Sequence, residues 1–130
     1  MSFASDFQNF SRKTGISADQ IVRKVCLDLT KDLTKATPVD TGMARSNYFF
    51  GMDRTGGTDA SLSKGGGPSM ARSASFASTL KAGGTFYITN NLPYILQITQ
   101  YGTSKQAAPG MLTTLVADWQ ARVNRIVATL

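Results

Sequence analysis

The chain has 130 residues, of which 42% are hydrophobic and 17% charged, so a single domain covering 1–130 with one core is expected. Its net charge is +6, it contains no His, and all eight of its acidic residues are Asp. The commonest general base and the commonest transition-metal ligand are therefore missing, which argues against an enzyme and gives no reason to expect a cofactor or metal. No apolar run reaches the roughly 18 residues that a membrane helix needs, so no membrane partner is expected.

The N-terminal segment 1–15 has two interpretations. Phe3, Phe7 and Phe10 are spaced four and three residues apart, which suits one stripe of a helix. The same segment is equally typical of a terminal arm that becomes ordered only in an assembly. It lacks the apolar run of a signal peptide.

A helix is predicted from Ala18 to Ala36. Ser17 and Gln20 form a capping-box pattern at its start, and Pro38 disfavours helical geometry at the residue before it. Cys26, the single cysteine, falls on the apolar side, so a buried and inert thiol is expected and no internal disulfide can form. The apolar face consists of Ile21, Val22, Val25, Leu29, Leu33 and Ala36.

The residues after this helix predict a turn and then a strand. Pro38 fixes one backbone angle, Asp40 can accept hydrogen bonds from nearby N–H groups, and Gly42 permits a positive φ. Asp40 is expected to be structural rather than catalytic, because the local sequence offers no acid or base partner. From Met43 to Met52, aromatic residues occupy both alternating positions, which indicates a strand covered on both faces.

The Gly-rich segment 53–69 is expected to be a flexible loop. It resembles a phosphate-binding loop only superficially, because Lys64 precedes the glycines instead of following them. Arg54 and Lys64 are the residues here that could contact DNA or line a channel. A basic nucleic-acid-binding module is the alternative function, supported by the net charge and by these two residues with Arg72 and Lys81.

The second half of the chain predicts short elements followed by a long helix. In the long helix, Trp119 is expected to be buried on the apolar side. The fold class is α+β, a small antiparallel sheet packed by a long N-terminal and a long C-terminal helix, with a flexible Gly-rich loop. The predicted elements are a helix at 70–80, a strand at 85–89, a helix at 93–101 and a helix at 109–129.

Turn residues separate these elements. Asn90 lies where the strand ends, Asn91 is expected to cap the following helix, and Pro93 suits its first turn. Gly102 is a suitable residue just past that helix, and Pro109 opens the next one. The short polar loop between them presents four residues as candidates for partner contact: Thr103, Ser104, Lys105 and Gln106.

Two blocks of this sequence resemble a known family. Residues 37–45, Thr-Pro-Val-Asp-Thr-Gly-Met-Ala-Arg, look like the TPVDTG-x-A-R motif of the neck and tail-completion proteins of tailed bacteriophages. Residues 88–94 and 101–111 look like the second block of that family, which is typified by HK97 gp10-like neck proteins and the lambda minor tail protein Z. The family often carries Leu-Glu-Tyr-Gly before the loop, whereas residues 98–102, Ile-Thr-Gln-Tyr-Gly, lack the Glu.

The resemblance implies a structural virion protein with no enzymatic activity, made in the host cytoplasm and located at the head–tail junction. The implied partners are further copies of itself in a sixfold or twelvefold ring, a head-closure or connector protein, a tail terminator or tail tube protein, and the DNA that passes through. The residues alone support the weaker statement that this is a small basic α+β domain suited to a symmetric ring.

Overall fold

The computed structural model describes residues 17–83 and 85–128, without the side chains of Trp119, Arg122 and Ile126. The fold is α+β, with several helices and a small two-stranded antiparallel sheet. The expectations for the arm 1–15, for burial of the Trp119 side chain and for a helix end at Thr129 lie outside the described residues. The elements are α2 (Ala18–Ala36), β1 (Tyr48–Gly51), α3 (Gly67–Ala77), β2 (Tyr87–Asn90), α4 (Ile95–Thr99), α5 (Met111–Ala117) and α6 (Trp119–Ala128).

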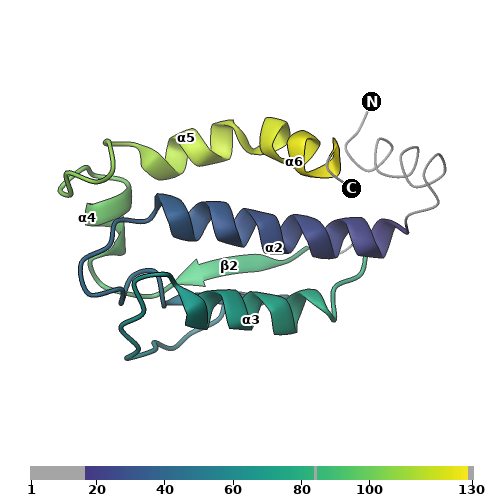
Figure 1. Ribbon diagram of the computed structural model, residues 1–130, viewed down its shortest axis with the longest axis horizontal. Coiled ribbons are helices and arrows are strands. Elements are labelled where there is room, and N and C mark those ends of the chain that lie inside the picture. Colours follow the sequence, from purple (N-terminus) through teal and green to yellow (C-terminus); the bar gives the residue numbers. More distant parts are fainter. Residues whose placement is uncertain (1–16, 84, 129–130) are drawn as a thin grey trace.

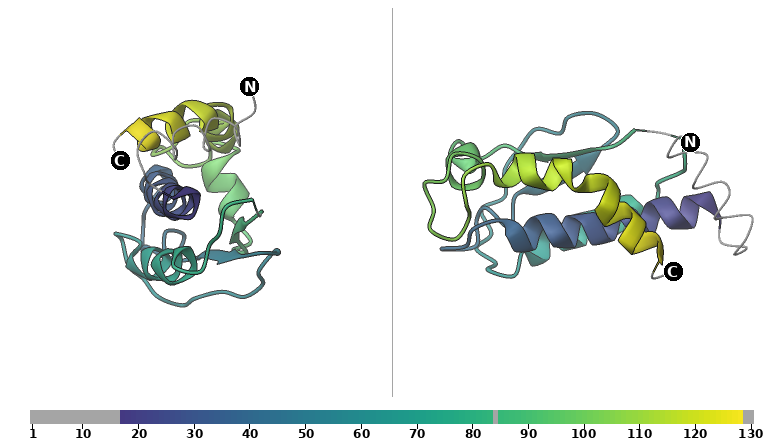
Figure 2. Two further views of the ribbon diagram at one scale, coloured as in Figure 1. Left: turned by 90° about the vertical axis from the view of Figure 1, so that its right-hand side faces the viewer. Right: turned by 90° about the horizontal axis from the view of Figure 1, so that it is seen from above.

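Helix α2 lies at the centre of the molecule. In Figure 1 it runs between α5 and α6 on one side and α3 with the sheet on the other, and the end-on view in Figure 2 shows the same order. The expected capping box is present at its start, because Gln20 N donates to Ser17 Oγ at 3.2 Å and Ser17 N donates to Gln20 Oε1 at 3.1 Å. This reciprocal pair satisfies N–H groups that a helix start otherwise leaves without partners.

Two apolar clusters lie on different sides of α2. Toward α6, Ile21, Val25 and Leu29 pack with Val123. Toward α3 and the sheet, Cys26 packs with Ala77 and Leu80. Partly buried side chains surround this second cluster: Val22, Leu27, Phe50, Phe76 and Phe86. The single apolar face predicted for this helix therefore understates its burial, since α2 is covered on two sides.

Small polar side chains line the contact between α2 and α3. Thr30 Oγ1 donates to Cys26 O at 2.7 Å and lies 2.8 Å from Ser73 Oγ. Cys26 is fully buried, as expected, and burial raises the pKa of its thiol. Because these polar groups bond one another, the two helices can pack closely without leaving them unsatisfied.

The two strands pair in antiparallel register, with Tyr48 opposite Asn90 and Gly51 opposite Tyr87. Helix α3 packs against β1, and its Phe76 ring stacks on Phe50 with ring centroids 6.3 Å apart. Both terminal helices were expected to pack the sheet; α2 does so through the cluster around Cys26, but α6 packs against α2 instead. The sheet is covered by α3, a helix that the sequence placed at 70–80 and that begins at Gly67.

The predicted strand at 43–52 is wrong in its first half, where residues 43–46 form a turn. Ser46 Oγ donates to Gly42 O at 2.7 Å, and Asn47 Nδ2 donates to Asp59 O at 2.9 Å. Ser and Asn side chains compete with strand pairing by bonding nearby backbone groups. The strand therefore begins only at Tyr48.

The C-terminal helix is divided, contrary to the prediction of one helix from 109 to 129. Helix α5 ends at Ala117, and the next residue, Asp118, has a φ of −90° and a ψ of 3°, which depart from helical geometry. The chain changes direction between α5 and α6, as the right-hand view of Figure 2 shows. Asp is a weak helix former because its side chain can bond nearby backbone groups. Asp118 Oδ2 also accepts a hydrogen bond from Arg125 of α6 at 3.2 Å.

The Gly-rich segment has no regular structure over residues 54–63, but several hydrogen bonds hold it to the rest of the chain. Asp59 N donates to Asn47 Oδ1 at 2.7 Å, and Ser63 N donates to Ser46 Oγ at 3.2 Å. Asn91 Nδ2 donates to the carbonyls of Thr55 and Gly57. Its flexibility stays a prediction, whereas these contacts were not anticipated.

Candidate functional site

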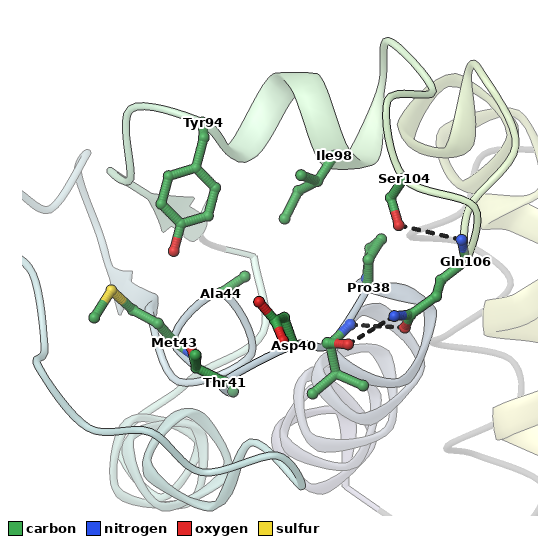
Figure 3. Close-up of a pocket in the computed structure, with 11 residues that line it drawn as sticks. Pro38, Asp40, Thr41, Met43, Ala44, Tyr94, Ile98, Ser104 and Gln106 are labelled. Carbon is green, nitrogen blue, oxygen red and sulfur yellow. Dashed lines mark hydrogen bonds between the residues drawn. The ribbon is translucent and has the colours of Figure 1, made fainter.

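Both blocks of the family resemblance contribute to one pocket. It has a volume of about 410 Å³ and lies between the turn after α2, helix α4 and the loop after α4 (Figure 3). The turn contributes residues 38–44, the second block contributes Tyr94, Ser104 and Gln106, and helix α4 adds Ile98. The described fold thus brings together segments that lie at least fifty positions apart in the sequence.

Gly42 holds the turn against the Gly-rich loop. Its φ is +93°, so the predicted positive φ is confirmed. A Cβ atom at this position would lie 2.5 Å from Lys64 N and would also overlap the backbone of Ser63. Gly42 is therefore required both by its own backbone conformation and by the close approach of a second segment.

Arg45 fixes the other end of the same turn. Its guanidinium donates to Thr37 O at 2.8 Å, to Lys64 O at 3.0 Å and to Lys35 O at 3.2 Å. Two of these carbonyls lie at the C-terminal end of α2, where a cation is favourable. The planar fork of an arginine suits this triple contact. In the sequence, only the position of Arg45 at the end of the first motif pointed to such a role.

Tyr48 connects this turn to the sheet. Its hydroxyl lies 2.5 Å from Thr37 Oγ1, and Thr37 Oγ1 also donates to Leu33 O at 2.8 Å. The ring is 4% exposed, and its burial raises the pKa of Tyr48 to about 12. The phenol is therefore neutral wherever the fold is intact at ordinary pH.

Gln106 joins the second block to the first. Its amide donates to Val39 O at 2.7 Å and accepts from Val39 N at 2.8 Å, as the dashed lines in Figure 3 show. Ser104 Oγ in turn accepts from Gln106 N at 3.1 Å. Gln106 was expected to contact a partner, but its amide is already used within the chain.

The loop that carries Gln106 is held at both ends. Thr103 Oγ1 donates to Gln97 O at 2.8 Å, and Gly110 N donates to Gln100 O at 2.7 Å. Gly102 has a φ of +75°, and a Cβ there would lie 2.5 Å from Pro109 Cγ. The expectation that Gly102 and Pro109 constrain this loop agrees with that contact, which leaves the exposed Lys105 on a constrained loop.

Of the two asparagines before α4, Asn90 lies at the end of β2 as expected, whereas Asn91 has a different role. Asn90 Nδ2 donates to Ala44 O at 3.0 Å, which ties β2 to the turn. Asn91 does not cap α4, because the side chain bonds the Gly-rich loop and the cap position is occupied by Tyr94. Pro93 precedes this helix, which begins at Ile95 instead of at the proline.

Asp40 lies at the pocket and points into it in Figure 3. It is exposed, and within the described residues its carboxylate makes no hydrogen bond, so the expected backbone contacts of Asp40 are not seen. Arg54 and Lys64 both have exposed side chains, and the carbonyl of Lys64 is held by Arg45. The structure describes no contact between Arg54 and Lys64.

Arg72 was counted as support for nucleic-acid binding, but its guanidinium is used inside the fold. It donates to Tyr48 O at 2.9 Å, forms an ion pair with Asp59 at 2.7 Å and lies 4.2 Å from the centroid of the Phe49 ring. Hydrogen bonds from Ser61 and then from Arg72 lower the pKa of Asp59 to about 2. Arg72 therefore organises the Gly-rich loop and is not a free basic group.

Among the described residues, no group of three or more His, Cys, Asp or Glu side chains is placed to hold a metal ion. No helix in this part of the chain is both long enough and apolar enough to cross a membrane. The chain matches no model of a known protein family, no curated protein and no solved structure. The resemblance to the phage neck proteins therefore rests on the two motifs of the sequence.

Proposed function

We propose that this chain is a structural virion protein of the phage head–tail junction. In this proposal, copies of the chain form a ring that joins the head connector to the tail and lets DNA pass. The neighbours would be a head-closure or connector protein on one side and a tail terminator or tail tube protein on the other. The chain would have no enzymatic role in this assembly.

The observation that supports the proposal is the contact between the two motif segments. Two blocks with a shared function are expected to meet in space, and here Gln106 bonds the backbone of Val39. The same contact holds the loop 103–106 in one conformation. Because a constrained loop loses little entropy on binding, it is suited to recurrent contact with a neighbour.

A ring needs two different complementary surfaces on each subunit. One candidate surface is the constrained loop with the exposed side chains of Tyr94, Leu96 and Tyr101, which belong to α4 and its flanks. The other candidate surface is the aromatic strand pair and its adjoining loop, where Met52, Leu62 and Tyr87 are exposed. Pairing of these two surfaces between neighbours would close a ring instead of a twofold dimer.

The test uses virions of the phage that encodes the chain. Lys105→Glu reverses an exposed charge on the loop and leaves the amide of Gln106 intact, so the fold should be retained. Electron micrographs of the Lys105→Glu virions should show heads and tails that are not joined, or tails that are incorrectly terminated. Lys81→Glu, an equal charge change at another exposed lysine, is the control and should give normal virions. Normal assembly with both variants would contradict a contact role for this loop.

A second measurement separates the proposal from the alternative of a nucleic-acid-binding module. A ring-forming protein should sediment as an oligomer, alone or with its neighbours. A nucleic-acid-binding module should remain small and should shift DNA strongly at low salt, since phosphate contacts are screened by salt. Virions lacking the chain that nevertheless join heads to tails would exclude the proposed function.

A further inference from the structure

A second pocket lies between the C-terminal half of α2 and the start of α3. Its volume is about 410 Å³. None of the residues that line it is acidic, and three of them are cationic. We propose that this pocket binds a phosphate group. The lining residues are Lys31, Thr34, Lys35, Arg45, Gly65 and Met70.

The charge of this pocket comes from its two lysines. The guanidinium of Arg45 already bonds three carbonyls, so its charge is largely used to balance the end of α2. Lys31 and Lys35 are exposed and have no acidic partner among the described residues. They lie four residues apart on one face of the helix, where like charges repel. An anion beside both ammonium groups would relieve that repulsion.

Thr34 supplies an independent indication of a ligand. The residue is only 4% exposed, and its Oγ1 has no hydrogen-bond partner among the described residues. A helical threonine can donate to the carbonyl four residues earlier, as Thr30 does to Cys26 at 2.7 Å. A buried hydroxyl without a partner is uncommon in folded proteins. Oγ1 itself is buried, so a phosphate oxygen in the pocket accepts its hydrogen bond once the Thr34 side chain rotates about χ1 to turn the hydroxyl toward the pocket.

The start of α3 adds a favourable field. Helix α3 has 11 residues, its N-cap Gly66 carries no side chain, and no acidic residue lies in its first turn. The positive end of the helix dipole is therefore not neutralised by a carboxylate. Gly67 N already donates to Ser63 Oγ at 3.2 Å, so the lysines and not this N–H group are the main ligands.

This site differs from the phosphate-binding loop that the sequence excludes. That loop would need a lysine directly after the glycines. Here the lysines come from α2, and the fold brings them to Gly65 across the contact between α2 and α3. The inference does not depend on the proposed head–tail function, because the isolated chain can be tested without any assembly.

The first experiment titrates the isotopically labelled full chain with inorganic phosphate at low ionic strength and follows its backbone amide signals by NMR. The signals of Thr34, Gly65 and Gly66 should shift and reach saturation. Lys31→Gln combined with Lys35→Gln should weaken binding at least about tenfold, because charge-assisted contacts dominate phosphate binding. Thr34→Val keeps the shape of the side chain and should weaken binding by a smaller factor. A chain whose three signals do not move would overturn the proposal.

The control makes an equal charge change elsewhere, Lys24→Gln combined with Lys81→Gln. It should leave the affinity for phosphate within about twofold, since long-range effects of exposed charges are screened. Equal weakening by the control and the pocket variant would mean that only net charge matters, and would overturn the site. Thermal melting of each variant checks that the fold is retained.

A second titration with a short DNA duplex identifies the source of the phosphate. If the pocket variant loses affinity for both inorganic phosphate and DNA, the site takes a phosphate of the DNA backbone. If it loses only inorganic phosphate, the ligand is a small phosphate compound. Both results support the pocket. Unchanged affinity of the pocket variant for both probes would overturn it, whatever the outcome of the virion experiment.

Discussion

The side-chain amide of Gln106 binds the backbone of Val39 in both directions, with one hydrogen bond of 2.7 Å and one of 2.8 Å. The two residues are 67 positions apart. The pairing imitates the exchange between two strands, although neither residue lies in a strand. It makes the turn after α2 and the loop after α4 one structural unit.

This pairing predicts different effects for two neighbouring substitutions. Gln106→Ala removes two hydrogen bonds and should lower the free energy of unfolding by about 1–2 kcal/mol. Lys105→Ala, at an exposed position without such bonds in the described chain, should change it by less than about 0.5 kcal/mol. Urea unfolding measures both. If Gln106→Ala is as stable as Lys105→Ala, the pairing does not constrain the loop in solution.

A second prediction compares substitutions at Gly42 and Gly57. Both have a positive φ, of +93° and +103°, but a Cβ at Gly42 meets the backbone of residues 63–64 and a Cβ at Gly57 meets nothing within 4 Å. Gly57→Ala should cost about 1–2 kcal/mol for the backbone conformation alone. Gly42→Ala should cost more, because two backbone segments must also separate.

Thermal melting of these two variants decides whether the close approach matters. The expected order of stability is the native chain, then Gly57→Ala, then Gly42→Ala. Equal losses would mean that backbone conformation explains the whole effect. A Gly42→Ala variant as stable as the native chain would contradict the described contact with the Gly-rich loop.

Local patterns in the sequence predicted the features that depend on neighbouring residues. The capping box at Ser17, the positive φ of Gly42 and the buried Cys26 all follow from short-range spacing or residue type. The break at Asp118 was missed because the apolar period continues through it into α6. Hydrophobic periodicity reports which side of a helix is buried and not whether the helix remains unbroken.

Long-range polar contacts were not predictable in the same way. Arg45, Arg72 and Gln106 each bond backbone groups, which exist at every position and leave no trace in the sequence. The strand predicted from Met43 was too long for a related reason, since Ser46 and Asn47 bond the backbone of other loops. Within the candidate site, the residue types were visible in the sequence, but their partners required the fold.

The buried phenol of Tyr48 predicts a loss of stability at alkaline pH. Its pKa is raised from 10.0 to about 12 in the folded chain. Below pH 10 the phenol is protonated in both states, whereas between pH 10 and pH 12 only the unfolded chain releases the proton. Unfolding is therefore favoured as pH rises through this window, by about 2–3 kcal/mol at its upper end.

Tyr48→Phe isolates this effect. Near pH 7 the variant should be less stable by about 1 kcal/mol, because the hydrogen bond to Thr37 is lost while Thr37 Oγ1 keeps its bond to Leu33 O. Toward pH 12 the difference should shrink and then reverse, since the variant has no phenol to ionise. Denaturant unfolding at several pH values measures the difference, and a constant difference would contradict the raised pKa.

The Gly-rich loop predicts unequal cleavage by trypsin at its two basic residues. Near Arg54, the restraint from a distant part of the chain is the side chain of Asn91, which donates to Thr55 O at 2.8 Å and to Gly57 O at 3.0 Å. Near Lys64, Arg45 holds the carbonyl, Ser46 accepts from Ser63 N, and Gly66 is buried. Cleavage requires local opening, whose free energy rises with the contacts that must break, so Arg54 should be cut before Lys64.

Asn91→Ala should accelerate cleavage at Arg54 and leave the rate at Lys64 unchanged, as measured by mass spectrometry of timed digests. Faster cleavage at Lys64 in the native chain would show that the segment around residues 63–66 opens more readily than its hydrogen bonds imply.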